Sequence, residues 1–378
     1  MDKEKSTTTF TAKTISGLEE VLQEELKNLG ATNTQLLKRA VSFEGDKALL
    51  YRTNYACHVA LRILKPIASF KLLKQEDLYT NLKAIPWEDY LENANTLAVD
   101  AVNSTSVFTN SQYVALKTKD AVVDRFRERT GARPSIDLDH PDLRINIHIY
   151  KETCNVSLDS SGESLHKRGY RKITGLAPLN EVLAAGLIRL SGWDAITPFY
   201  DPMCGSGTLP IEAGMMAWHY PGGYFRPEFG FERWKDFDPE LWRSIKEEEN
   251  NKIIESPVQI TGSDISARSI GIAGENLRYV KFDSRIKIKV AAFDETIPPG
   301  PTGLIICNPP YDERLHLDNI IAFYQRIGDV LKQKYKGYEA WVISSDIEAL
   351  KFIGLHPSKK IAVFNGPLEC RFVRFKLY

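Results

Sequence analysis

Hydrophobic and polar positions along the chain alternate between a period typical of strands and a period typical of helices. In the first 62 residues, positions 10–15 have the strand pattern, 17–29 the helical pattern closed by Gly30, 35–43 alternate, and 45–62 are helical again. Ser16 is a suitable cap for the first helix. This order predicts a small α/β unit over residues 1–62.

A second unit is predicted over residues 63–164. Its helices are expected at 77–84 and 111–130, and a strand is expected at 96–102. Two further strands, 144–150 and 153–157, are separated only by Lys151-Glu152, which predicts a hairpin. Ser160-Ser161-Gly162 interrupts the pattern and marks the predicted boundary of the unit.

Residues 165–378 have the pattern of a larger α/β domain. An apolar helix at 178–190 precedes four short apolar runs of strand length, at 195–200, 258–264, 286–290 and 303–307. The end of the chain, 359–364 and 370–377 around Asn365-Gly366-Pro367, predicts a hairpin. An aromatic-rich insertion at 217–255 separates the first two strands, and we favour packing over substrate contact as its role.

A glycine-rich turn joins the strand at 195–200 to a helix at 209–218. Its sequence is Asp201-Pro202-Met203-Cys204-Gly205-Ser206-Gly207-Thr208. Gly205 and Gly207 allow the backbone to turn tightly beside a ligand, and the first N–H groups of the helix are free to donate. A dinucleotide fingerprint needs a third glycine where Pro210 stands, which disfavours NAD. An ordinary tight turn is the alternative.

A second motif, Asn308-Pro309-Pro310-Tyr311, follows the apolar strand at 303–307. Prolines end the strand, so Asn308 and Tyr311 are expected at the carboxyl edge of the sheet, where open α/β folds bind ligands. The Asn308 amide oxygen and the Pro309 carbonyl can accept both hydrogens of an exocyclic amine, and the Tyr311 ring can stack on the base. A plain Asn-Pro turn is the alternative.

Composition limits the class of protein. With 378 residues, 43% of them hydrophobic, the chain is long enough for two or three domains with a large core. Apolar runs shorter than a membrane span and a polar start at residues 1–9 predict a cytoplasmic protein. Five cysteines without CxxC spacing argue against a disulfide framework and against a zinc site, so no metal is expected.

Net charge gives no support to nucleic-acid binding, because 49 basic residues balance 49 acidic ones. Local basic patches must therefore hold any RNA. The strongest candidate is the segment 166–172, in which Lys167, Arg168, Tyr170 and Arg171 suit phosphate contacts and stacking on a base. Packing between domains explains this segment equally well.

The glycine-rich turn and the Asn-Pro-Pro-Tyr motif, in this order, resemble those of the amino-methylating S-adenosylmethionine (SAM)-dependent methyltransferases. The segment 165–171, followed by Ala177-Pro178-Leu179-Asn180-Glu181, extends the resemblance over nearly the whole chain. The chain is similar to the bacterial 23S rRNA guanine-N2 methyltransferases that carry a THUMP domain. The resemblance implies a ferredoxin-like subdomain at 1–62, a THUMP RNA-binding domain at 63–164 and a Rossmann-like class I methyltransferase domain at 165–378, with a mostly parallel sheet and an antiparallel last strand.

The resemblance also implies the site. SAM is expected at Pro202, Cys204, Gly205, Gly207 and Thr208, with Asp201 as the candidate for its ammonium group. Asp264 stands where the carboxylate for the ribose hydroxyls is expected, although it is also a possible helix cap, a role that Ser266 can serve instead. Asp294 is expected at the adenine amino group. Asn308, Pro309 and Tyr311 are the expected catalytic residues, with Asn308 also beside the cofactor.

The expected function is methylation of guanine N2 in 23S rRNA, with no membrane and no metal as partner. The residues alone leave adenine N6 and cytosine N4 open as target atoms, because each belongs to an exocyclic amine. An adenine-N6 nucleic-acid methyltransferase, a glutamine methyltransferase of release factors and a catalytically silent RNA-binding protein are the alternatives.

Overall fold

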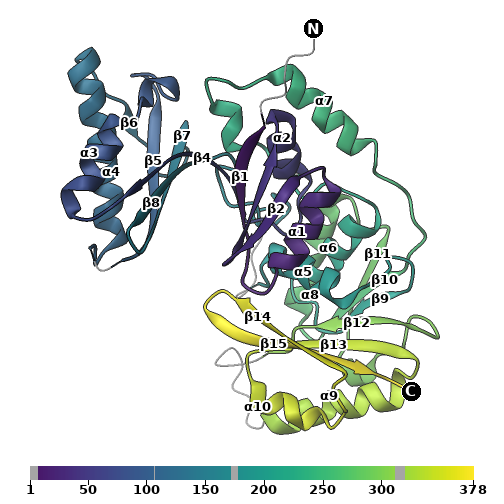
Figure 1. The fold of residues 1–378 in the computed structure, drawn as a ribbon. Coiled ribbons are helices and arrows are strands. Elements are labelled where there is room, and N and C mark those ends of the chain that lie inside the picture. The colour runs from purple at the N-terminus through teal and green to yellow at the C-terminus, as the bar shows by residue number, and fades with distance from the viewer. Residues whose placement is uncertain (1–6, 106, 172–177, 311–319) are drawn as a thin grey trace.

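Two mixed β-sheets form the frame of the protein (Figure 1). The computed structural model describes residues 7–105, 107–171, 178–310 and 320–378. The first sheet has eight strands in the order β2-β3-β1-β4-β8-β7-β5-β6, and the second has seven in the order β11-β10-β9-β12-β13-β15-β14. The fold is therefore α/β in both halves of the chain, as the sequence predicts.

The elements of the first half agree with the predicted pattern except at 35–43, at 45–71 and at the short strand of residues 135–136, which was not predicted. Positions 35–43, expected as one alternating stretch, belong to two strands that turn at Lys38 and Arg39, where Arg39 has a φ of 57°. The helix expected over 45–62 ends at Ala56, and a strand that the sequence analysis did not predict begins at Arg62. The elements are β1 (Thr8–Lys13), α1 (Glu19–Asn28), β2 (Thr32–Leu37), β3 (Ala40–Gly45), α2 (Lys47–Ala56), β4 (Arg62–Lys71), α3 (Gln75–Ala84), η1 (Trp87–Asp89), β5 (Thr96–Ser104), α4 (Ser111–Thr130), β6 (Ser135–Ile136), β7 (Leu143–Tyr150) and β8 (Thr153–Asp159).

Strand β4 joins the two predicted N-terminal units into one sheet. It pairs antiparallel with β1 on one side, where Thr11 lies opposite Leu64, and with β8 on the other, where Asp159 lies opposite Leu64. Beyond this strand, β5 to β8 with α3 and α4 stand apart from the rest of the molecule (Figure 1). The predicted limits 1–62 and 63–164 thus meet inside a continuous sheet, not at a flexible linker.

The second half is a mostly parallel sheet with an antiparallel end, as the sequence predicts. Strands β11, β10, β9, β12 and β13 are parallel, and β15 and β14 are antiparallel. The elements are α5 (Glu181–Ser191), β9 (Phe199–Asp201), α6 (Thr208–Ala217), η2 (Gly230–Arg233), α7 (Pro239–Asn250), β10 (Ile260–Asp264), α8 (Ala267–Val280), β11 (Ile286–Val290), η3 (Phe293–Glu295), β12 (Gly303–Cys307), α9 (Ile320–Lys334), β13 (Tyr338–Ser344), α10 (Ile347–Leu350), η5 (Lys351–Ile353), β14 (Lys359–Asn365) and β15 (Leu368–Lys376).

The strand order reverses between β9 and β12, which are neighbours in the sheet although β10 and β11 separate them in the chain. Such a reversal opens a crevice at the carboxyl ends of the strands, where open α/β sheets bind ligands. The glycine-rich turn follows β9, and Asn308 follows β12. The topology therefore brings both sequence motifs to one crevice.

The insertion at 217–255 packs on helix α2 of the N-terminal half. The Phe231 ring stacks on Tyr51 of α2 with centroids 4.3 Å apart, and Trp242 of α7 meets Tyr55 of α2 edge-on at 5.4 Å. Arg52 of α2 binds Glu249 of α7 at 2.9 Å. The packing role that the sequence favours for these aromatic residues is confirmed.

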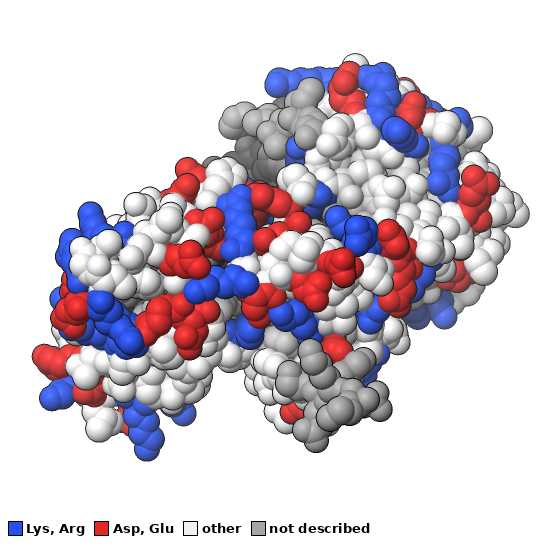
Figure 2. Space-filling view, turned by 90° about the horizontal axis from the view of Figure 1, so that it is seen from above, with Lys and Arg blue, Asp and Glu red and all other residues white. Residues whose placement is uncertain are grey.

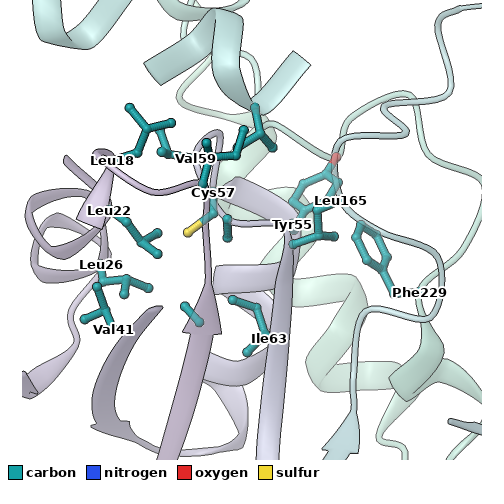
Figure 3. Packing of buried hydrophobic residues seen from close by; sticks show 14 of the residues in the cluster. Leu18, Leu22, Leu26, Val41, Tyr55, Cys57, Val59, Ile63, Leu165 and Phe229 are labelled. Carbon is teal, nitrogen blue, oxygen red and sulfur yellow. The ribbon is translucent and has the colours of Figure 1, made fainter. Parts of the chain in front are cut away.

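Both halves share one hydrophobic core. Figure 3 shows members of one cluster of buried residues: Leu22 and Leu26 of α1, Leu18 just before that helix and Ile63 of β4, with Leu165 and Phe229 from the second half. Leu18 packs so closely on α5 that a Cβ atom at Gly186 would lie 2.5 Å from its Cδ1 atom. The N-terminal sheet is therefore built into the second half and is not a loosely tethered module.

Candidate active site

The glycine-rich turn is held open at the carboxyl end of β9. Gly205 and Gly207 have φ values of 53° and 85°, a left-handed conformation that favours glycine. A Cβ atom at Gly207 would lie only 3.2 Å from the Cβ atom of Ala273 on α8. The backbone N–H of Cys204 donates to the Ser263 carbonyl at 2.9 Å, which fixes the turn against β10.

Asp264 ends β10 beside this turn, and its carboxylate is oriented by two backbone donors. Oδ2 accepts from the Gly205 N–H and Oδ1 from the Ser266 N–H, both at 2.9 Å. The helix cap of α8 is Ser266, whose Oγ accepts from the Ser269 N–H at 3.2 Å. Asp264 therefore does not serve as the cap, and it holds a charged group at the edge of the crevice.

Asp201 lies below the turn and is buried. Its Oδ1 accepts from the Met203 N–H at 3.0 Å. Burial raises the pKa of Asp201 well above its usual range, and the negative charge of Asp264 acts in the same direction. Pro202, Cys204 and Thr208 are also buried, so the ligand-facing part of the turn is mainly the backbone around Gly205.

The side-chain amide of Asn308 has a buried oxygen atom, Oδ1, without a hydrogen-bond donor among the described residues. Leaving a buried acceptor without a donor costs about 1–3 kcal/mol, so such atoms call for an explanation. Pro309 beside it is buried, and Tyr311 lies outside the described residues. The structure thus presents the amide oxygen of the motif as an acceptor at the crevice.

Asp294 follows β11 at the same edge of the sheet and is exposed. The Lys334 ammonium donates to its backbone carbonyl, which anchors the 3₁₀ helix η3. The preceding Phe293 ring lies 5.5 Å from Tyr335. Of the sequence-predicted cofactor residues, Asp201, Gly205, Gly207 and Asp264 thus lie together, while Asp294 stands further along the edge.

The structure corrects the expectation for two residues of the basic segment. Arg168 and Tyr170 are each only 1% exposed, so their side chains have no surface for RNA. Lys167 is exposed and pairs with Glu163 at 2.6 Å. Arg171 donates to Glu181 at 2.9 Å and to Thr208 Oγ1 at 3.0 Å, linking α5 to the first residue of α6.

Arg168 and Tyr170 meet at Glu212, a fully buried carboxylate on α6. The Tyr170 hydroxyl donates to Glu212 Oε1 at 2.9 Å, and Arg168 Nε lies 3.4 Å from the same oxygen. His58, in the loop between α2 and β4, lies 3.8 Å from Oε2. Burial raises the pKa of Glu212, but Arg168, His58 and Tyr170 together bring it below its usual range.

The importance of Glu212 was not anticipated, although the sequence carries a signal for it. Glu212 is the single charged residue in the otherwise apolar helix α6. A buried charge must be paired with an opposite charge. The basic residues of segment 166–172, which precede α6 in the sequence, are candidates for this partner. Packing between domains, the alternative given for this segment, is therefore the role of Arg168 and Tyr170.

Metal ligands and membrane spans were both searched for in the described residues. No group of three or more His, Cys, Asp or Glu side chains is placed to hold a metal ion in these ranges. Over the same ranges, no helix has the length and apolar character needed to cross a bilayer. The five cysteines are buried free thiols.

Comparison with known families identifies the fold. Residues 168–374 match the model described as RMKL-like, methyltransferase domain. The chain belongs to this family of methyltransferases. Residues 74–159 match the THUMP domain and residues 9–64 the RlmL ferredoxin-like domain, in the order that the sequence predicts.

Relatives of this methyltransferase extend over its whole length. A Synechocystis protein named "Putative RNA methyltransferase slr0064" is 38% identical over 377 residues, 99% of this chain and 98% of that protein. The crystal structure of SMU.472, "a putative methyltransferase complexed with SAH", has a TM-score of 0.87 at 28% identity and covers 98% of both chains. A Listeria monocytogenes structure, "a predicted N6-adenine-specific DNA methylase", has a TM-score of 0.86 at 29% identity and covers 99% of this chain and 97% of its own.

Replacing Arg168 tests its structural role. Arg168→Met keeps the volume of the side chain but leaves the buried Glu212 without its main cation, so we expect a loss of about 3–5 kcal/mol in the free energy of unfolding. The measurement is urea unfolding followed by tryptophan fluorescence. Lys167→Met, one residue away but exposed, is the control and should change stability by less than about 0.5 kcal/mol. Equal stability of both variants would contradict the assignment.

Proposed function

We propose that this methyltransferase transfers the methyl group of SAM to guanine N2 in 23S rRNA. The unsatisfied Oδ1 atom of Asn308 carries the proposal, because an exocyclic amine supplies the donor that this atom lacks. The THUMP domain and the name of the Synechocystis relative support an RNA substrate. The match to the RlmL ferredoxin-like domain and the resemblance over 165–181 support guanine N2 of large-subunit rRNA. A cytoplasmic location accords with such a substrate.

The described residues fit SAM as the cofactor. When bound, SAM supplies a methyl group that is already activated by its sulfonium. The left-handed turn at Gly205 and Gly207 leaves room for close approach of a ligand, and the Asp264 carboxylate is oriented for two hydroxyls. Asp294 is our candidate for the adenine amino group and Asp201 for the ammonium group. The SAH bound by the SMU.472 protein supports SAM as the cofactor.

Asn308 and Pro309 orient the target amine. An exocyclic amine is a weak nucleophile, because its lone pair is delocalised into the base. Two hydrogen bonds, one to Asn308 Oδ1 and one to the Pro309 carbonyl, favour a pyramidal nitrogen and direct its lone pair at the methyl group. A strong general base is not required, since the nitrogen becomes acidic as the new bond forms. The proposed catalytic role of the crevice is therefore to orient the target amine toward the methyl group.

Asn308→Ala should lower turnover on unmodified rRNA by orders of magnitude and leave SAM affinity nearly unchanged, because the lost interaction is made mainly in the transition state. Transfer of labelled methyl groups and calorimetry with SAM measure the two quantities. Asn308→Asp keeps an acceptor oxygen at this position and should retain a larger share of the turnover. If Asn308→Ala weakens SAM binding as much as it lowers turnover, the orienting role is refuted.

If Asp201 binds the ammonium group, SAM binding should be coupled to the release of a proton. Burial raises the pKa of the Asp201 carboxyl, whereas a cationic ammonium group beside it would favour the charged form and lower that pKa, so binding should release a proton at a pH between the two pKa values. SAM affinity should then rise with pH until the raised pKa is passed. Calorimetry at several pH values, each in two buffers of different ionisation enthalpy, measures the release. Asp201→Asn should abolish it; identical release in this variant would remove Asp201 from the ammonium site.

Methylation of adenine N6 is the second candidate. Asn308 Oδ1 accepts from this amine equally well, and the Listeria relative is named for this activity on DNA. A glutamine methyltransferase of release factors is disfavoured, because its usual N-terminal part is helical, whereas here the described N-terminal residues form an eight-stranded sheet. The intact Asn308 site disfavours a silent RNA-binding protein.

A further inference from the structure

One buried amide beside the glycine-rich turn lies outside the residues expected to bind the cofactor. Asn276 of α8 is 1% exposed. Its Nδ2 donates to the Ser206 carbonyl at 3.1 Å, and its Oδ1 has no donor among the described residues. The visible face in Figure 2 gives no comparable signal, because basic and acidic side chains are intermingled over it with no broad field of one sign.

Stability alone does not explain this amide. A buried acceptor left without a donor costs at least as much as one neutral hydrogen bond contributes. A leucine side chain, which has a similar shape, would avoid that cost at a position closed to solvent, and the Ser206 carbonyl belongs to a residue that is only partly buried. The hydrogen bond of Asn276 is thus better explained by what it does to the turn.

The Ser206 carbonyl receives no hydrogen bond from helix α6. The helix starts with the bond from the Ile211 N–H to the Gly207 carbonyl at 3.0 Å, so Ser206 lies one residue outside it. The residue four positions after Ser206 is Pro210, which has no N–H to donate. The proline that disfavours a dinucleotide fingerprint therefore leaves this carbonyl to a donor from another element, and Asn276 is that donor.

Helix α8 is fitted to the turn by two residues on one face. Ala273 and Asn276 are three positions apart, so their side chains lie on the same side of the helix. A Cβ atom at Gly207 would lie 3.2 Å from the Ala273 Cβ atom, which shows how closely the helix approaches the turn. The small Ala273 side chain allows this approach, and Asn276 makes the hydrogen bond.

Asn276 adds an anchor to a turn that β10 already holds on its other side. The N–H groups of Cys204 and Gly205 both donate to the end of β10, at 2.9 Å each. The next peptide, between Ser206 and Gly207, is held at its N–H by the Cys204 carbonyl at 2.8 Å, within the turn itself. Asn276 holds the carbonyl of the same peptide from outside. Both ends of this peptide are thus fixed, although glycine by itself leaves the backbone free.

We propose that Asn276 is a positioning residue for the cofactor. Through the Ser206 carbonyl it holds the turn in its left-handed conformation before SAM binds, so that binding does not have to order the backbone. This role rests on the proposed placement of SAM at the turn, and it does not depend on which base is methylated. It assigns Asn276 no contact with the methyl group or with the target amine.

Asn276→Leu keeps the approximate shape of the side chain and removes its donor. The dissociation constant for SAM should rise by about three- to tenfold, the range for one lost neutral hydrogen bond. In the SAM-free protein, the backbone N–H groups of residues 203–211 should exchange with deuterium faster, because the turn opens more often. Calorimetry with SAM and hydrogen exchange with mass spectrometry measure these effects on the full-length protein, and urea unfolding should show little change in stability.

A second variant and a matched control complete the test. Asn276→Asp places an acceptor oxygen against the Ser206 carbonyl, so it should weaken SAM binding at least as much. Asn103 of β5 is the matched control, because its Nδ2 donates to the Phe108 carbonyl at 2.6 Å and its Oδ1 is likewise buried without a donor among the described residues. It lies in the part of the molecule that stands apart in Figure 1. Asn103→Leu should change neither SAM affinity nor exchange in the turn.

Asp264→Ala separates this proposal from the placement of SAM. If Asp264→Ala weakens SAM binding and Asn276→Leu does not, the placement stands and the positioning role is wrong. The role is also wrong if Asn276→Leu weakens binding without faster exchange in the turn, because the amide then does not act through the turn. If neither variant weakens SAM binding, the placement of SAM at the turn fails, and the proposal fails with it.

Discussion

One buried carboxylate determines how the two halves of this methyltransferase fit together. Glu212 is on α6, the helix that follows the glycine-rich turn, and it is shared by Arg168, Tyr170 and His58. Arg168 also donates to the carbonyls of His58 and Leu165. A buried charge is tolerated only when its partners are in place. The loop between α2 and β4, which carries His58, the segment 166–171 and helix α6 must therefore assemble together.

This constraint gives the THUMP domain a fixed position relative to the crevice. Strand β4 places it in the same sheet as the ferredoxin-like subdomain, and the core around Leu18 and Gly186 joins that subdomain to α5. The insertion reinforces the joint through Tyr51 and Phe231. An RNA held by the THUMP domain, as we propose, would thus meet Asn308 at a set distance.

The sequence analysis predicted correctly the features that depend on neighbouring residues. It was wrong or silent where a feature depends on residues that are distant in the sequence. The glycine-rich turn, the strand at 303–307 and the order of domains follow from patterns within a few residues, and they are confirmed. Strand β4 was missed altogether, because strand partners on both sides of it lie far away in the chain. Arg168 and Tyr170 looked like RNA contacts for the same reason: basic and aromatic residues suit either a phosphate or a buried carboxylate, and only the fold shows which is near. The roles of Asn308, Asp264 and Asp294 remain predictions.

The central claim is the identity of the methylated atom, and nucleoside analysis tests it most directly. The protein is incubated with labelled SAM and unmodified 23S rRNA, and the RNA is digested and separated by liquid chromatography with mass spectrometry. We expect label in N2-methylguanosine, because Asn308 Oδ1 and the Pro309 carbonyl would accept the guanine N2 amine. Label in N6-methyladenosine would contradict the account and identify adenine as the target base.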